Sequence, residues 1–318
     1  MTEKLNNYLP SEARGVTRRA FLRAAGCVLL VEPALQVGNF IEAKTKNDNF
    51  EIEILKNPES PFTIIVAPGM QNDGHAIHKL LGPQLGEIAS VISLAYPTSD
   101  APLNMGALFS QVSDSMRKNN LRNPSFLGIS LGGAVNAQLL PHFYAARAEF
   151  GMPQTFACDS TPLSMQHVRE DQIFLAELGR HNRYSAALSA VKTAWAENIL
   201  PDPSSHQPGI DTGLVKTHLN AIAHSELWAV ASQGDFLYNL QIGPGSLEGM
   251  ASSARYILTQ NDPLVNCEQA CNDMQLLFGT THVEPTLAPL RPIDRHACSS
   301  EFPAGTVALF MQDFELVS

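Results

Sequence analysis

The sequence places a serine between two glycines, Gly128-Ile129-Ser130-Leu131-Gly132, in a setting that suits nucleophilic chemistry. A nucleophilic serine needs its hydroxyl held at a sharp corner between a strand and a helix, and flanking glycines leave room for that corner. The backbone N–H of Leu131, at the start of the following helix, would then favour negative charge developing on a carbonyl oxygen. The pattern predicts Ser130 as a nucleophile. The alternative is an ordinary serine in a tight turn, because short motifs also arise by chance.

The segments around Ser130 have the required order of strand, corner and helix. Residues 101–120 show the spacing of an amphipathic helix. Residues 125–129 are a short apolar run typical of a central parallel strand. Residues 131–140 are rich in small and apolar residues, with no helix breaker before Pro141, and predict a buried helix.

Four further apolar runs predict strands at 62–67, 91–95, 155–158 and 255–259. Strands that alternate with helical patterns are typical of an α/β fold, a doubly wound, mostly parallel sheet with helices on both faces. Functional residues of such sheets collect at the carboxyl ends of the strands. Ser130, Asp159, Asp262 and the loop after Ala67 all fall at such ends.

This order of residues resembles that of the serine hydrolases of the α/β-hydrolase superfamily: a loop after a strand, the serine corner, an acid and then a histidine. The resemblance covers the chain from about Lys46 to the carboxyl terminus. It implies an α/β-hydrolase fold, an esterase- or lipase-like activity and a Ser-His-Asp catalytic triad. Serine rather than aspartate at position 130 argues against the dehalogenase and epoxide hydrolase branches.

The resemblance also implies an oxyanion hole built from two backbone N–H groups. Leu131 supplies the first, and Met70 supplies the second from the loop at 68–74. The family's loop usually begins with His-Gly, whereas this one begins with Pro68-Gly69. This departure lies in the loop that carries Met70, so it bears on the assignment of Met70 and not on that of Leu131.

Two aspartates are candidates for the acid of the triad. Asp262 follows a late strand, in a loop that resembles the family's usual acid loop, and is the acid we predict. Asp159 ends an earlier strand, a position that some lipases use instead. Either residue could simply cap a helix or form a turn.

The base must be chosen among ten histidines, and position along the chain decides. His296 lies after a final strand predicted at 279–287 and before a closing helix predicted at 307–316, where the family places its base. His282, near the start of that last strand, is the alternative. His75 and His78, beside the loop after Ala67, are expected to contact solvent or substrate.

The chain is long enough for one large α/β domain with an insertion. Helical patterns at 163–200 and 213–230 interrupt the alternation of strands, and the resemblance implies a helical cap there. We predict four segments: an N-terminal segment at 1–45, the first part of the hydrolase core at 46–162, the cap at 163–249 and the second part of the core at 250–318. Trp195 and Trp228 either line an acyl pocket or pack the cap.

The formal net charge of −10 argues against nucleic-acid binding, which needs a basic surface. No run of eighteen apolar residues predicts a transmembrane helix. The sequence contains neither a phosphate loop nor a dinucleotide fingerprint, and no cysteine and histidine spacing suggests zinc. We therefore expect a small-molecule acyl substrate, no cofactor and no metal, and the sequence does not indicate an oligomeric state.

The N-terminal segment has a composition of its own. Residues 17–23, Thr-Arg-Arg-Ala-Phe-Leu-Arg, precede a short apolar run at 24–31 and predict a bacterial twin-arginine export signal. Glu32 cuts that run short, and residues 41–43 are the best available cleavage site. The alternatives are a basic amphipathic helix of a cytoplasmic protein and a lipoprotein box at 24–27.

The five cysteines are expected to be free thiols, with a bridge from Cys298 to Cys267 or Cys271 as the alternative. For the function, the first hypothesis is a cofactor-independent hydrolase of carboxylic esters or related acyl compounds. The second is an acyltransferase or thioesterase that uses the same triad. The third is a non-catalytic binding protein that keeps the fold.

Overall fold

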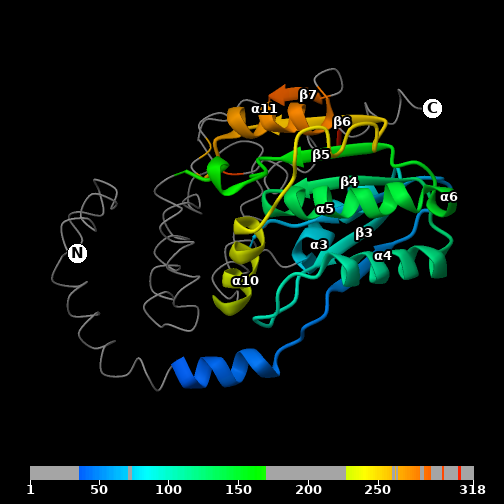
Figure 1. Cartoon of the computed structure of the whole chain (residues 1–318). Helices are drawn as coiled ribbons and strands as arrows, with labels where there is room; N and C mark the ends of the chain where they lie inside the picture. Colours follow the sequence, from blue (N-terminus) through cyan, green and yellow to red (C-terminus); the bar gives the residue numbers. More distant parts are fainter. Residues whose placement is uncertain are drawn as a thin grey trace, which may run out of the picture.

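A computed structural model of the chain describes the residues at 36–70, 74–169, 227–259, 262, 264–279, 283–287, 296 and 307–308 (Figure 1). Several predictions concern residues outside these ranges. They are the export signal at 17–31, most of the cap, the alternative base His282, the thiol of Cys298 and most of the closing helix.

A seven-stranded sheet forms the centre of the protein, with the strands in the order β1-β3-β2-β4-β5-β6-β7. The strands are β1 (Glu51–Leu55), β2 (Thr63–Ala67), β3 (Ser90–Ala95), β4 (Pro124–Ile129), β5 (Thr155–Asp159), β6 (Ser253–Leu258) and β7 (Val283–Leu287). β1 pairs antiparallel with β3, and the other strands run parallel to one another. The predicted doubly wound, mostly parallel sheet is confirmed. The sequence analysis did not predict β1.

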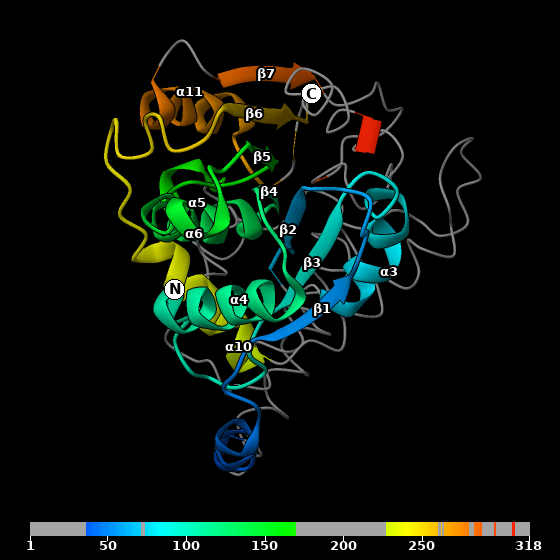
Figure 2. The same cartoon turned by 90° about the vertical axis from the view of Figure 1, so that its right-hand side faces the viewer.

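Helices cover both faces of the sheet (Figure 2). Besides a helix at 36–45, the structure contains α3 (Gly74–Leu85), α4 (Met105–Asn119), α5 (Leu131–Ala145), α6 (Arg147–Phe150), α10 (Leu227–Tyr238) and α11 (Cys267–Phe278), with a 3₁₀ turn at Met165–His167. The apolar residues of α3 pack on one face of the sheet, and those of α4, α5 and α11 pack on the other. Every residue of β2, β4 and β5 is buried between these layers, which explains their continuous apolar runs.

Two predicted helix ends differ from the structure. The helix predicted from residue 101 begins at Met105, because the side chain of Asn104 caps it by accepting from the amide of Ala107. The helix predicted to end before Pro141 continues to Ala145. Proline removes one intrahelical hydrogen bond, but the next turn carries Phe143, a fully buried ring that packs against Phe109, Phe126 and Phe150. This burial outweighs the cost of the proline.

The start of α5 lies directly against the end of β2. A Cβ atom on Gly132 would lie 1.9 Å from the carbonyl oxygen of Ala67 and 2.6 Å from that of Pro68. A Cβ atom on Gly128 would lie 2.2 Å from the Cα of Gly133. The two glycines of the serine motif are therefore required by close backbone contacts, as the sequence analysis expected.

The chain that leaves β5 is fastened to α11 through His167, which is 1% exposed. Its Nδ1 accepts from the amide of Leu163 at 3.0 Å, and its Nε2 lies 2.6 Å from the Oδ2 of Asp273 on α11. This pair of contacts requires a neutral ring with its proton on Nε2. The carbonyl of His167 also accepts from the amide of Asn266, next to α11. The entry to the predicted cap is thus tied to the loop that follows β6.

Residues 36–45 form a helix that packs on α10. Ala43 is fully buried in a cluster with Trp228 and Ala229, so the candidate cleavage site at 41–43 lies within this helix. The indole N–H of Trp228 donates to the carbonyl of Thr98 at 2.8 Å. Trp228 is therefore a packing residue. In the described part of the chain, no helix combines the length and apolar character needed to cross a membrane.

The close approach of α5 to β2 predicts the effect of Gly132→Ala. The added methyl group meets backbone atoms that cannot turn away, so the free energy of unfolding should fall by at least about 2 kcal/mol. Gly234→Ala in α10 is the matched control, because a Cβ atom added there would have nothing within 4 Å. That change should raise stability by about 0.5–1 kcal/mol. Urea denaturation measures both, and equal effects of the two substitutions would contradict the packing described.

His167 predicts a pH dependence of stability. Burial lowers its pKa, and the opposing effect of Asp273 does not restore the ordinary value of 6.5. As pH falls below about 6.5, the unfolded chain binds a proton at this position that the folded chain does not, so stability is lost. Unfolding of His167→Gln between pH 8 and 5 should show a shallower loss, by up to one proton. His142→Gln, at an exposed histidine, is the control, and an unchanged slope in His167→Gln would refute the assignment.

Candidate active site

Ser130 occupies a strained corner between β4 and α5. Its φ is 51° and its ψ is −122°, a conformation that residues with a side chain rarely adopt. The amide of Ser130 donates to the carbonyl of Asp159 at 2.8 Å, and its carbonyl accepts from the amide of Gly133 at 3.1 Å. These backbone contacts to β5 and α5 hold the corner.

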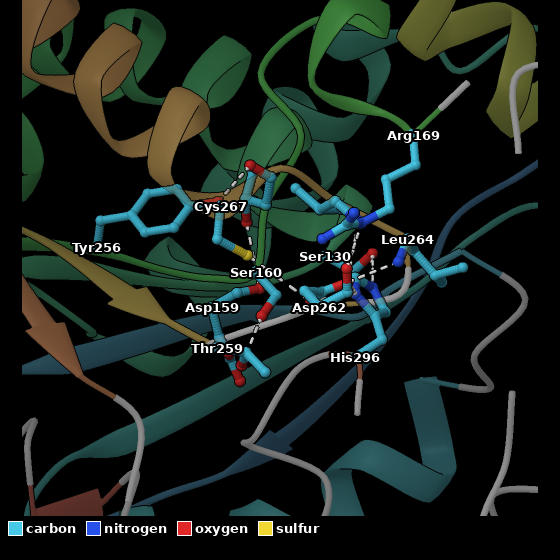
Figure 3. A network of polar contacts seen from close by, with 12 residues as sticks. Ser130, Asp159, Ser160, Arg169, Tyr256, Thr259, Asp262, Leu264, Cys267 and His296 are labelled. Carbon is cyan, nitrogen blue, oxygen red and sulfur yellow. Dashed lines mark hydrogen bonds and ion pairs between the residues drawn. The ribbon is translucent and has the colours of Figure 1, made fainter. Parts of the chain in front are cut away.

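The structure brings the three predicted residues Ser130, His296 and Asp262 together (Figure 3). The Nε2 of His296 lies 2.6 Å from the Oγ of Ser130. Its Nδ1 lies 3.0 Å from the Oδ1 and 2.9 Å from the Oδ2 of Asp262. A carboxylate requires the ring proton on Nδ1, so Nε2 accepts from the serine hydroxyl. The imidazole is therefore oriented to take the proton of Ser130.

Asp262 is 1% exposed, yet its environment suits a charged carboxylate. The Oδ1 atom accepts from the amides of Leu264 and Val265 at 2.8 and 2.9 Å. Burial by itself would raise the pKa of Asp262, but His296 and these two amides outweigh it and hold the pKa below its usual range. Asp262 thus stays ionised beside His296.

Two further side chains contact Asp262, and the sequence analysis did not assign either of them to the site. The Nε of Arg169 donates to the backbone carbonyl of Asp262, from a segment that follows the bridge between Val168 and Val265 (Figure 3). The thiol of Cys267 lies 3.7 Å from the Oδ2 of Asp262. No motif marks either residue, because the contact of Arg169 joins two distant loops and the contact of Cys267 depends on where α11 begins.

The loop after β2 lies beside the start of α5, through the close approach at Gly132. The hydroxyl of Tyr96, at the end of β3, donates to the carbonyl of Pro68 at 2.6 Å. Met70 is partly buried against the apolar cluster that α4, α5 and α11 form with the sheet. Leu131 is the first residue of α5. The two residues predicted as oxyanion donors are thus in segments that meet at this edge of the sheet.

The alternative candidates have other partners. Asp159 ends β5, and its backbone carbonyl holds the amide of Ser130. His75 contacts Glu51 and Glu53 on β1, and the Nδ1 of His78 lies 2.9 Å from the hydroxyl of Ser93 on β3. Both histidines therefore belong to the β1–β3 end of the sheet.

Three cysteines lie in the described part of the chain. Cys158, Cys267 and Cys271 are buried free thiols. Within the described ranges, no group of three or more histidine, cysteine, aspartate or glutamate side chains is arranged to hold a metal ion.

Comparison with known proteins identifies the fold. No model of a protein family and no curated protein matches the sequence. Among solved structures, a hydrolase from Pseudomonas aeruginosa is similar at a TM-score of 0.60 and 16% identity, over 83% of this chain and 94% of the other. The enol-lactonase from Burkholderia xenovorans is similar at a TM-score of 0.60 and 14% identity, over 84% and 96%. A thermophilic esterase from Thermogutta terrifontis is similar at a TM-score of 0.61 and 11% identity, over 86% and 98%.

At such low identities, the similarity establishes the architecture and leaves the activity to be argued from the site. These neighbours share the doubly wound sheet, and the strand order and serine corner described above agree with it. The chain has the α/β-hydrolase fold.

Proposed function

We propose that the chain is a serine hydrolase that cleaves a carboxylic ester or a related acyl compound through an acyl-enzyme. Ser130 is the nucleophile, His296 the general base and Asp262 the acid that orients it. The observation that carries this proposal is the 2.6 Å contact between the Nε2 of His296 and the Oγ of Ser130, made at a strained corner. The similarity to solved hydrolases, an esterase and an enol-lactonase supports it.

The chemistry follows from the contacts. As the Oγ of Ser130 attacks the acyl carbon, its proton passes to the Nε2 of His296, and Asp262 stabilises the resulting imidazolium. The Nε2 proton then passes to the departing alcohol, which leaves an ester on Ser130. Water attacks that ester, giving its proton to Nε2 and releasing the carboxylic acid, and Ser130 recovers its proton.

Negative charge develops on the acyl oxygen in both halves of the reaction. We propose that the backbone amides of Leu131 and Met70 stabilise this charge. Leu131 begins α5, so the helix N-terminus adds a favourable dipole. The hydrogen bond from Tyr96 to the carbonyl of Pro68 supports the loop that carries Met70.

Covalent labelling tests the nucleophile. A fluorophosphonate probe should modify the wild-type protein on the peptide that contains Ser130, as read by mass spectrometry. Ser130→Ala should abolish the adduct, and His296→Ala should slow its formation at least about a hundredfold, because the general base is lost. Ser164→Ala, at a nearby serine outside the site, should label like the wild type. A folded wild-type protein without an adduct would contradict the proposal and favour the non-catalytic binding protein.

The support from Tyr96 predicts a separate effect. Tyr96→Phe keeps the buried ring but leaves the carbonyl of Pro68 without its donor, so the loop after β2 loses one fixed point. The rate constant for probe labelling should fall roughly three- to tenfold, the effect of one lost neutral hydrogen bond. Tyr144→Phe on α5 is the control for a lost tyrosine hydroxyl. Equal labelling by Tyr96→Phe and the wild type would show that the loop needs no such support.

A further inference from the structure

The two oxygens of Asp262 have different surroundings. The Oδ1 atom accepts from the amides of Leu264 and Val265, which belong to its own loop. The Nδ1 of His296 lies near both oxygens, 3.0 Å from Oδ1 and 2.9 Å from Oδ2. The thiol of Cys267 contacts the Oδ2 atom, at 3.7 Å. Cys267 is therefore the one side chain besides His296 that the described residues place in hydrogen-bonding contact with this carboxylate.

The position of Cys267 is set by its helix. Cys267 is the first residue of α11, whose N-terminus is capped by the side chain of Asn266. The side chain is 4% exposed and lies beside the ends of β5 and β6, near Ser160 and Tyr256 (Figure 3). A buried donor on a capped helix has little freedom to leave the carboxylate.

We propose that Cys267 is a positioning residue of the active site, whose thiol donates to the Oδ2 of Asp262 and so holds the carboxylate in place for His296. The proposal rests on the proposed function, since it assigns Asp262 as the acid of the triad. It adds a residue from α11 to the support that the acid loop receives from its own amides.

The thiol can play this part because it stays protonated. Burial raises the pKa of Cys267 to about 12, and the charge of Asp262 raises it as well, whereas hydrogen bonds with Ser160 and the backbone of Thr259 oppose the shift. The other titratable groups around it are Asp159 on β5 and Tyr256 on β6. A neutral S–H donates to a carboxylate, whereas a thiolate would repel it.

A thiol also differs from a hydroxyl in strength. Sulfur is a weak donor and holds its acceptor at longer range than oxygen does. It can orient the Oδ2 atom while leaving most of the negative charge available to the Nδ1–H of His296. Supporting groups of this kind keep a catalytic side chain within its productive geometry.

The test compares Cys267→Ala, Cys267→Ser and Cys271→Ala. Cys271 is the matched control: it lies one turn further along α11, is also 4% exposed, and makes no hydrogen bond to Asp262 in the described part of the chain. For each protein, the rate constant of fluorophosphonate labelling is measured from pH 5 to 9. The Nδ1 proton of His296 is followed by NMR, and thermal unfolding reports folding.

Cys267→Ala should lower the labelling rate constant roughly three- to tenfold, below the usual effect of a hydrogen bond to a carboxylate because a thiol is a weak donor. It should also move the acidic midpoint of the rate profile upward, because the carboxylate keeps more charge for the imidazolium. The Nδ1 resonance should shift. Cys267→Ser, which restores a donor, should recover most of the rate, and Cys271→Ala should stay within about twofold of the wild type.

Two results would overturn the proposal: a Cys267→Ala protein with unchanged rate profile and resonance, or equal changes in Cys271→Ala. If Cys267→Ala does not fold, the comparison of Cys267→Ser with the wild type decides. A hydroxyl is a stronger donor than a thiol, so the proposal predicts that the Nδ1 resonance of His296 and the acidic midpoint shift in Cys267→Ser. Unchanged values would then overturn it. A wild-type protein that does not label defeats the proposed function. The resonance of His296 would then still show whether Cys267 holds Asp262.

Discussion

A carboxylate buried in the loop after β6 governs the arrangement of this end of the protein. An ionised group that is removed from water costs several kcal/mol unless donors surround it. Asp262 is 1% exposed and is met by two backbone amides, an imidazole and a thiol. The loop after β6 must therefore follow a path on which the backbone amides of Leu264 and Val265 point toward the carboxylate. The capped start of α11 and the ring of His296 complete the enclosure.

The strained serine depends on a second constraint, the density of backbone around it. A positive φ at a residue with a side chain costs on the order of 1–3 kcal/mol and persists only where neighbours over-determine it. Here the amide of Ser130 donates a hydrogen bond to β5, and Gly132, which has no side chain, lets the first turn of α5 lie directly against the end of β2. Parallel strands on both sides of β4 thus supply the stabilisation that the corner requires.

Most strands of the sheet could be predicted from the sequence, and the elements that could not were missed for physical reasons. Interior parallel strands such as β4 are buried on both faces and read as continuous apolar runs. β1 was not predicted because most of the predicted strands were apolar runs, whereas in this five-residue terminal strand glutamates alternate with apolar residues, the pattern of a half-buried strand. The extent of α5 was underestimated because the burial of Phe143 is a tertiary effect that outweighs the local cost of Pro141.

The site shows the same division. Ser130 carries a local motif, and Asp262 and His296 follow from their order along the chain, so the sequence sufficed to nominate them. Arg169 is 93 residues from Asp262 along the chain, and only the folded path of two loops brings its guanidinium to that carbonyl. Cys267 is near Asp262 in sequence, but a cysteine at that spacing has no recognisable meaning until α11 is placed.

The glutamates on β1 affect whether two copies of the protein can pair through this strand. β1 is the terminal strand of the sheet that the described residues form, and the outer edge of a terminal strand can pair with an extended chain that approaches it. Glu51 and Glu53 project from this strand, and His75 lies between their carboxylates. A second copy adding its own β1 there would bring two sets of like charges together. Repulsion between these carboxylates disfavours a continuous sheet that runs from one molecule to the next.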